Sequence, residues 1–289
     1  MDHEKLIMKL IQSADNPFFK ELTKLAGSAR QRSKARYNKV GHNQARQTLL
    51  DGAHLLAAYL DAGMLPQHLL LNKSALQNDE IAALLARVGK VPVTQLDDKL
   101  FAKLSELKTP GGMLALINVP SSPVGLPTAA TQSRFALLLE DIQDPGNLGS
   151  ILRSAAAAGC DTVYLSPGCA DAWSPKVLRA AMGGHFSLAI HEQQKLSVIA
   201  QTFCATSAGT LLATSLQAKH SLYDCDLRGN IAFLIGNEGA GLSAEMLNLA
   251  TQKIAIPMQG KIESLNAAAA AAICLFEAMR QRVGAENRV

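Results

Sequence analysis

The sequence predicts an α/β fold with a mostly parallel sheet, and three observations support this class. Continuous apolar runs of five residues, such as Phe135–Leu139 and Ile231–Ile235, are typical of strands buried on both faces. Stretches of helical length alternate with these runs. Loops rich in Gly, Pro, Asn and Asp separate the two patterns. The chain has 289 residues, enough for one large domain or two ordinary ones. Its hydrophobic content of 48% is enough for packed cores.

Residues 1–44 are predicted to be a basic helical segment. Its apolar positions are Leu6, Leu10, Phe18, Phe19, Leu22 and Leu25, and Asn16-Pro17 is expected to begin its second helix. Residues 1–50 contain ten Lys or Arg against four Asp or Glu. The densest basic run comprises Arg30, Arg32, Lys34, Arg36 and Lys39. Composition alone leaves two interpretations open, a solvated helix face and a surface that binds a phosphate backbone.

Residues 45–119 are predicted to form a small α/β domain. Arg46–Ala62 is expected to contain a short strand followed by a helix. The other expected strands are His68–Asn72, Val91–Thr94 and Met113–Val119. The other expected helices are Asp79–Val88 and Asp97–Leu107. Residues 120–133 follow, with three prolines and no charged side chain, and are interpreted as an interdomain linker. An ordinary surface loop is the alternative.

Residues 134–289 are predicted to form a second, larger α/β domain. The expected strands are Phe135–Leu139, Thr162–Leu165, Phe186–Ile190, Thr210–Thr214, Ile231–Ile235 and Lys253–Ile256, and the expected helices are Leu148–Ala158, Lys176–Met182, Leu196–Thr206, one capped by Ser243, and Leu265–Arg282 capped by Ser264. Ligands of open α/β sheets bind beyond the carboxyl ends of the strands. Asp144, Asn147 and Arg153, which follow the first strand, are therefore candidates for chemistry.

Three loops share one arrangement, because each follows an apolar strand and precedes a helix. They are Asp144–Ser150, Gly236–Gly241 and Met258–Asn266, and we expect them to meet at one edge of the sheet. The spacing in GNEGAG is not that of a dinucleotide fingerprint, and a GKS or GKT phosphate loop is absent from the sequence. Backbone amides at such helix starts bind carboxylates or phosphates.

The positions of the cysteines and histidines indicate which kinds of site and compartment to expect. The five cysteines are scattered without a CxxC pair, and the seven histidines form no HExxH motif, so no metal site is expected. Scattered cysteines favour reduced thiols and a cytoplasmic protein. The sequence has no apolar run near the ~20 residues of a membrane span, and its first residues lack the apolar core of a signal peptide.

Three stretches together resemble a known family. DPGNLGSILRSAAAAG, IGNEGAGLS and IPMQGKIESLNAAAAAAICLFEAMRQR are similar to the three signature motifs of the SpoU (TrmH-type) RNA ribose methyltransferases of the SPOUT superfamily. Upstream, LLDGAHLLAAYLDAG and LSELKTPGGMLALI resemble the family's N-terminal substrate-binding domain. The resemblance implies a SPOUT-type C-terminal domain with a deep trefoil knot. It also implies S-adenosylmethionine as methyl donor, a ribose 2′-hydroxyl of RNA as acceptor, and a homodimer that completes the site.

The resemblance also implies roles for particular residues. The catalytic positions fall on Asn147, Arg153, Glu238, Ser264 and Asn266. The cofactor contacts fall on Thr214, Gly236, Ile256, Met258, Leu265 and Asn266, largely through backbone groups. Two positions depart from the family pattern: Ala268 stands where a small hydroxyl residue is frequent, and Asp51 stands where glutamate is usual.

The expected function is therefore an S-adenosylmethionine-dependent RNA 2′-O-methyltransferase, with RNA held by the basic segment and the small domain. A separate RNA-binding domain favours large-subunit (23S) rRNA over tRNA as the substrate. Two alternatives from other classes are a non-catalytic RNA-binding assembly factor on the same scaffold and a small-molecule α/β enzyme that uses another nucleotide. Whether Arg153 takes the 2′-hydroxyl proton or only orients that group stays open, because a guanidinium normally remains protonated.

Overall fold

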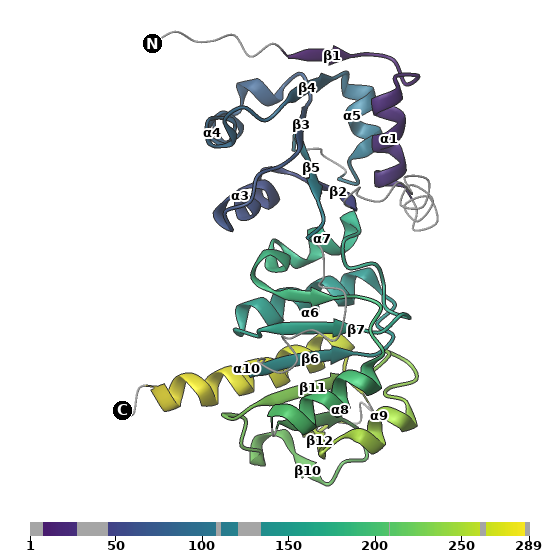
Figure 1. Cartoon of the computed structure of the whole chain (residues 1–289), viewed down its shortest axis with the longest axis vertical. Coiled ribbons are helices and arrows are strands. Elements are labelled where there is room, and N and C mark those ends of the chain that lie inside the picture. Colours follow the sequence, from purple (N-terminus) through teal and green to yellow (C-terminus); the bar gives the residue numbers. More distant parts are fainter. Residues whose placement is uncertain are drawn as a thin grey trace. The chain divides into compact units, whose positions relative to one another are not determined.

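The computed structural model describes residues 8–27, 46–107, 111–120, 134–207, 209–260 and 264–286. The chain divides into two compact units, each with its own sheet (Figure 1). The first unit comprises the described residues of Met1–Ser121 together with Trp173–Phe186, and the second comprises those of Ser122–Ala172 and Ser187–Val289. In the described part of the chain, no helix has the length and apolar character needed to cross a membrane.

The first unit is a five-stranded sheet with helices packed on it. Its strands are, in sheet order, β1 (Lys9–Ile11), β4 (Val93–Leu96), β3 (His68–Leu71), β5 (Met113–Asn118) and β2 (Gln47–Asp51). Its helices are α1 (Pro17–Ala26), α3 (Ala53–Asp61), α4 (Asp79–Val88), α5 (Asp98–Leu104), α7 (Pro175–Ala181) and the 3-10 turn η1 (Ala75–Gln77). β5 runs antiparallel to β2 and β3, and the other pairs are parallel. Side chains of α1 and α5, including Phe19 and Phe101, pack on Leu70 and Leu114 of the sheet.

The N-terminal segment differs from the prediction. Residues 9–11 are a strand and not part of a helix, because they pair in parallel with β4 and bury Ile11 in the core. The partner strand, β4, lies far away in the sequence, so the local spacing of apolar residues cannot reveal this pairing. The second predicted helix is confirmed. The Asn16 Oδ1 atom accepts hydrogen bonds from the amides of Phe18 (2.9 Å) and Phe19 (3.2 Å), and Pro17 occupies the first turn of α1.

The basic run of the predicted RNA-binding residues lies outside the described residues. It comprises Arg30, Arg32, Lys34, Arg36 and Lys39.

The second unit contains a seven-stranded sheet in which every pair is parallel. The strands are, in sheet order, β10 (His220–Ser221), β12 (Gln252–Ala255), β9 (Thr210–Thr214), β11 (Ile231–Ile235), β6 (Phe135–Leu139), β7 (Thr162–Leu165) and β8 (Ala189–His191). The helices are α6 (Pro145–Ala157), α8 (Leu196–Ser207), α9 (Ala244–Leu249) and α10 (Ala267–Glu286), with the 3-10 turn η4 (Leu222–Asp224). A further 3-10 turn, η3 (Gly184–Ser187), spans the boundary, and its residues 184–186 belong to the first unit. The mostly parallel sheet predicted for this region is confirmed. β6 and β11 lie side by side at its centre, which explains their uninterrupted apolar sequences.

Alternate residues of β6 face opposite layers of the second unit. Ala136 and Leu138 belong to the core beneath α8. Phe135 points the other way, because the guanidinium of Arg282 in α10 lies 4.7 Å from its ring centroid. The sheet is therefore covered on both faces, with α8 and α9 in contact on one and α6 and α10 in contact on the other.

Two predicted elements of this unit are corrected. Phe186–Ile190 is not one strand, because η3 extends to Ser187 and the strand β8 occupies Ala189–His191. Ser264 does not cap the last helix. α10 begins at Ala267, and the Asn266 Oδ1 atom accepts from the amides of Ala268 (2.9 Å) and Ala269 (3.3 Å). Asn and Ser are equally good N-cap residues, so the sequence alone does not choose between the two positions.

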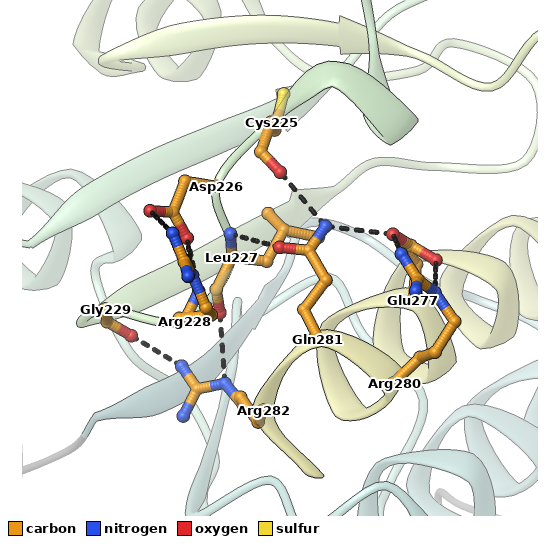
Figure 2. Close-up of polar contacts among 9 residues, drawn as sticks. All are labelled: Cys225, Asp226, Leu227, Arg228, Gly229, Glu277, Arg280, Gln281 and Arg282. Atoms are coloured by element: carbon orange, nitrogen blue, oxygen red, sulfur yellow. Dashed lines mark hydrogen bonds and ion pairs between the residues drawn. The ribbon is translucent and has the colours of Figure 1, made fainter. Parts of the chain in front are cut away.

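Two side chains attach the C-terminal part of α10 to the segment that precedes β11 (Figure 2). Gln281 accepts from the Leu227 amide (2.9 Å) and donates to the Cys225 carbonyl (3.0 Å). Arg282 donates to the carbonyls of Leu227 (3.1 Å) and Gly229 (2.5 Å). These bonds satisfy backbone groups that no strand or helix pairs, and so they fix the register of α10 on the sheet.

The segment Trp173–Phe186 lies inside the range 134–289 that the sequence assigns to the C-terminal domain, yet it belongs to the first unit. The Thr48 hydroxyl of β2 donates to the Trp173 carbonyl over 2.7 Å in a buried position. Arg179 of α7 lies 3.5 Å from the carboxylate of Glu106. This excursion of the chain completes the packing around β2.

Candidate active site

The candidate site lies at the carboxyl edge of the second sheet. Because all seven strands are parallel, the loops after β6, β9, β11 and β12 leave the sheet at the same edge. The loop after β6 leads into α6, and the loop after β11 leads into α9. The three loops predicted to meet therefore share this edge.

Three of the five predicted catalytic residues form one hydrogen-bonded chain. The Asn147 Nδ2 atom donates to Glu238 Oε1 over 3.0 Å. The Asn266 Nδ2 atom donates to Asn147 Oδ1 over 2.9 Å. The Asp144 amide adds a longer contact of 3.4 Å to Glu238 Oε1. The Asn147 side chain is thus held on both sides, and one amide hydrogen and one lone pair are left over for a ligand.

Helix starts place both asparagines of this chain. Asp144 caps α6, and its Oδ1 atom accepts from the Asn147 amide over 2.8 Å. Pro145 occupies the first turn, so α6 begins three residues earlier than the sequence indicates. Asn266 is the cap of α10. Since a cap fixes the backbone of its helix, the two side chains approach each other with little freedom.

Glu238 is ionised at neutral pH. Burial opposes its charge, but the hydrogen bond from Asn147 and those from the backbone amides of Glu238, Asp144 and Gln143 outweigh that effect and hold its pKa below the usual 4.5. An ionised carboxylate only accepts hydrogen bonds, which fits its position opposite the Asn147 amide.

The other two predicted catalytic residues are not part of the hydrogen-bonded chain. Arg153 is exposed on α6 and forms no hydrogen bond or ion pair with any residue that the structure describes. Ser264 is exposed as well, but it lines the neighbouring cavity. The Arg153 guanidinium therefore retains all its donors for a group outside the described part of the chain.

A cavity of about 490 Å³ lies beside the chain of polar residues. Five of the six predicted cofactor residues line it: Thr214, Gly236, Ile256, Met258 and Leu265. Asn266, the sixth, is not among the lining residues and contacts Asn147 instead. Glu238 belongs to both the cavity wall and the polar chain, so the two parts form one site.

Sequence reasoning missed part of the cavity wall. Ser215, Leu216 and Gln217 line it from the loop after β9. The rule that ligands bind after parallel strands applies to β9 as well and points to this loop. Leu242 and Leu247 also line the cavity, and no local signal distinguishes them from other core leucines.

The residues present fit a nucleoside-like cofactor. The volume lies within the ~300–1,000 Å³ typical of small-molecule pockets. Apolar side chains such as Leu247 and Ile254 suit a flat ring, and exposed loop backbone offers donors and acceptors. Gly236 has no space for a side chain, because a Cβ there would overlap the backbone of Gly241 and Leu242. Glycine at this position lets the loop fold tightly around the cavity.

Comparisons with known proteins agree with this geometry. Residues 134–276 match the SpoU rRNA Methylase family, and residues 16–115 match the MRM3-like substrate binding domain. An uncharacterized tRNA/rRNA methyltransferase of Synechocystis is 34% identical, with 96% of each chain covered. The 23S rRNA (guanosine(2553)-2′-O)-methyltransferase RlmP of Bacillus subtilis is 30% identical over 93% of this chain and 98% of that protein.

Solved structures give the same result. The SpoU methyltransferase AviRb from Streptomyces viridochromogenes, in complex with the cofactor AdoMet, superposes with a TM-score of 0.77 at 27% identity. The superposition covers 93% of this chain and 100% of AviRb. With both parts of its sequence and both halves of its fold matched, the chain belongs to the SpoU rRNA methylase family.

Proposed function

We propose that this protein transfers a methyl group from S-adenosylmethionine to a ribose 2′-hydroxyl of RNA. The observation that carries the proposal is the chain of Asn266, Asn147 and Glu238 at the edge of a 490 Å³ cavity. RlmP, a 2′-O-methyltransferase, and AviRb, crystallised with AdoMet, support it as relatives of similar length. The reaction class and the cofactor follow from the family and the site together.

The cavity would hold the cofactor through Thr214, Gly236, Ile256, Met258 and Leu265. The Thr214 hydroxyl donates to the Leu234 carbonyl over 3.0 Å, which holds this side chain against β11 at the cavity wall. When bound, S-adenosylmethionine supplies an electrophilic methyl group on a sulfonium. The glycine-containing loop after β11 lets backbone atoms approach that ligand closely.

The hydrogen-bonded side chains of Asn266, Asn147 and Glu238 would position the ribose hydroxyl. Glu238 fixes the orientation of the Asn147 amide, and Asn147 offers its remaining hydrogen and lone pair to the substrate. Arg153 is free of partners among the described residues and would bind a backbone phosphate or orient the 2′-hydroxyl. Positioning of a weak nucleophile and exclusion of water then supply most of the rate. Ser264, in the cavity wall, would contact the cofactor or the ribose.

Large-subunit rRNA is the substrate that we favour, with tRNA as the alternative. RlmP is named for 23S rRNA, and residues 16–115 match a substrate-binding domain of MRM3 type. We infer that residues 45–119 and the basic run from Arg30 to Lys39 hold the RNA, while residues 134–289 carry out the transfer. All five cysteines are free thiols, in keeping with work in the reducing cytoplasm.

We also propose a homodimer and a trefoil knot in this protein. Ala269, Phe276 and Val283 of α10 are spaced by seven residues and are all exposed, so one apolar stripe of the helix lacks a cover among the described residues. A second copy of the chain would cover it. The chain also returns from β12, near one side of the sheet, to pack α10 on α6, a path that supports the knot.

Methyl transfer to purified RNA tests the proposal. The protein is incubated with isotope-labelled S-adenosylmethionine and with unmodified rRNA or tRNA, and labelled nucleosides are identified by mass spectrometry. We expect a single 2′-O-methylnucleoside in the large-subunit rRNA. If label appeared only in tRNA, tRNA and not large-subunit rRNA would be the substrate. Cofactor binding without label in free RNA or in ribosomal assembly intermediates would favour a non-catalytic RNA-binding factor.

A further inference from the structure

Asp141, two residues beyond the end of β6, has an unusual backbone. Its φ angle is 55°, a left-handed conformation that residues with side chains seldom adopt. The Asp141 amide donates to the Ser166 hydroxyl oxygen over 2.9 Å, and that hydroxyl donates back to Asp141 Oδ1 over 2.5 Å. A Cβ atom on Gly168 would overlap the same carboxylate. The side chain of Asp141 is therefore held between Ser166 and Gly168.

Asn237, the residue before Glu238, donates to the backbone carbonyl of Asp141. Its Nδ2 atom lies 2.8 Å from the Asp141 oxygen. Its Oδ1 atom accepts from the amides of Gly239 (2.9 Å) and Ala240 (3.0 Å), which closes a turn within the same loop. The Asn237 side chain thus performs two separate tasks: one end shapes the loop after β11, and the other joins this loop to the end of β6.

The position of Glu238 depends on this junction. Glu238 is exposed, and its contacts to the loop after β6 are those with Asn147 and with the amides of Asp144 and Gln143. A carboxylate on an exposed loop stays within 3.0 Å of Asn147 only if the two loops keep their separation. The Asn237–Asp141 bond joins the two loops one residue from Glu238, and the bond from the Ser243 amide to Glu140 Oε2 (2.7 Å) joins them farther from it.

We propose that Asn237 is a positioning residue for methyl transfer, which acts by tying the loop of Glu238 to the Asp141 carbonyl. The inference rests on the proposed function, because it assigns Asn237 a role in presenting Asn147 and Glu238 to the ribose. Asn237 also lines the cavity, but the oxygen that shapes its loop is distinct from the donor that bonds to Asp141. Loss of the donor alone should therefore lower turnover far more than cofactor affinity. Without the tie, the Asn147 amide loses its fixed orientation, whereas the loop turn at the cavity wall persists.

Asn237→Asp separates the two tasks of this side chain. The aspartate keeps an oxygen for the amides of Gly239 and Ala240. It replaces with an acceptor the donor that faces the Asp141 carbonyl (2.8 Å) and, at 3.5 Å, Glu238 Oε2. Asn78→Asp is the matched control. Asn78 caps α4 with its Oδ1 atom on the amides of Glu80 (2.9 Å) and Ile81 (3.3 Å), and its Nδ2 atom has no partner among the described residues.

We expect Asn237→Asp to lower kcat by ~10²-fold, the usual cost of a misplaced reacting group, while the Kd of S-adenosylmethionine stays within about threefold of wild type. Asn78→Asp should match wild type in both. Gly168→Ala perturbs the other end of the tie by displacing the Asp141 carboxylate, and should also lower kcat with little change in Kd. A wild-type kcat in Asn237→Asp or Gly168→Ala, or a tenfold weaker cofactor affinity in Asn237→Asp, would overturn the proposal.

Hydrogen–deuterium exchange separates this inference from the proposed function, because it needs no RNA and no transfer. In Asn237→Asp we expect faster exchange both in residues 140–147 and in residues 236–241, since the lost bond links the Asp141 carbonyl to the Asn237 side chain. Faster exchange in residues 236–241 alone would show that Asn237 acts only within its own loop. That result would contradict the proposal that it links this loop to the end of β6. If wild type fails to methylate RNA, the exchange result still stands.

Discussion

Asn147 and Glu238, 91 positions apart in the sequence, are joined by a hydrogen bond of 3.0 Å from Nδ2 to Oε1. Asn266 contacts the other side of Asn147, so three loops contribute one side chain each. None of the three side chains is buried, and none is held by its neighbours in sequence alone. The arrangement depends on the parallel order of β6, β11 and β12, which brings the loops to one edge.

Arg153→Ala tests whether the exposed arginine of α6 serves the reaction. We expect methyl transfer to fall by at least ~100-fold, as when a charged group that stabilises the reacting atoms is removed. Cofactor affinity should stay close to wild type, because Arg153 does not line the cavity. Single-turnover transfer and isothermal titration measure the two quantities. Partial activity in Arg153→Lys would favour a phosphate anchor, and normal turnover in Arg153→Ala would remove the residue from the mechanism.

Arg282→Ala and Arg228→Ala form a matched pair for stability (Figure 2). Arg282 donates to carbonyls that have no strand partner, including those of Leu227 and Gly229, so its loss should lower the free energy of unfolding by about 1–3 kcal/mol. Arg228 forms an exposed ion pair with Asp226 at 2.8 Å, and its loss should cost much less, because solvent and salt screen exposed ion pairs. Urea unfolding of both variants checks this. Equal losses would show that the attachment of α10 does not depend on Arg282.

His191→Phe should make the fold more resistant to acid. Both ring nitrogens of His191 are buried without a hydrogen-bond partner in the described structure, and the ring stacks on Tyr164 at 5.2 Å. Burial lowers the pKa of His191 below its usual 6.5, so the unfolded chain binds a proton more readily than the folded one. Wild type should therefore lose stability as the pH falls through and below 6.5. Phenylalanine keeps the stacking and does not titrate.

Unfolding in urea at about pH 7.5 and about pH 5.5 measures the difference between His191→Phe and wild type. At the higher pH we expect a gain of about 1 kcal/mol from removal of unsatisfied buried nitrogens, and a larger gain at the lower pH. Burial also lowers the pKa of His68. This residue is present in both proteins, so its contribution cancels in the difference. His220→Gln, a change of an exposed ring, is the control. A difference that does not change with pH would rule out titration of His191.

Deletion of residues 1–119 should leave a chain with exposed apolar surface. Val177 and Leu178 of α7 are fully or almost fully buried, and their segment packs with the first unit. Without that unit, we expect binding of a hydrophobic dye and elution as aggregates in gel filtration. The same deletion with Val177→Ser and Leu178→Ser should reduce both effects. A monodisperse, dye-free deletion without the two substitutions would show that the segment is stable by itself.

Local chemistry determines much of this molecule, and the sequence is sufficient to predict it. The apolar runs of β6 and β11 predict buried parallel strands, because a strand that is covered on both faces favours consecutive apolar residues without alternation. Asn16-Pro17 and Ser243 predict helix starts, since a cap bonds to amides only two or three residues away. The three motifs of the family, and the cavity residues that they contain, follow from the same short stretches.

Long-range packing decides the rest. Residues 9–11 are a strand only because β4 offers an edge, and α7 joins the first unit only because β2 lies there to receive it. The bond between Asn147 and Glu238 likewise requires the sheet order that places β6 beside β11. Each of these contacts joins residues far apart in the chain, and their free energy depends on a geometry that exists only after folding. The sequence by itself therefore determined the elements, the motifs and the family, whereas tertiary structure alone decided which loops meet, which residue caps α10 and to which unit α7 belongs.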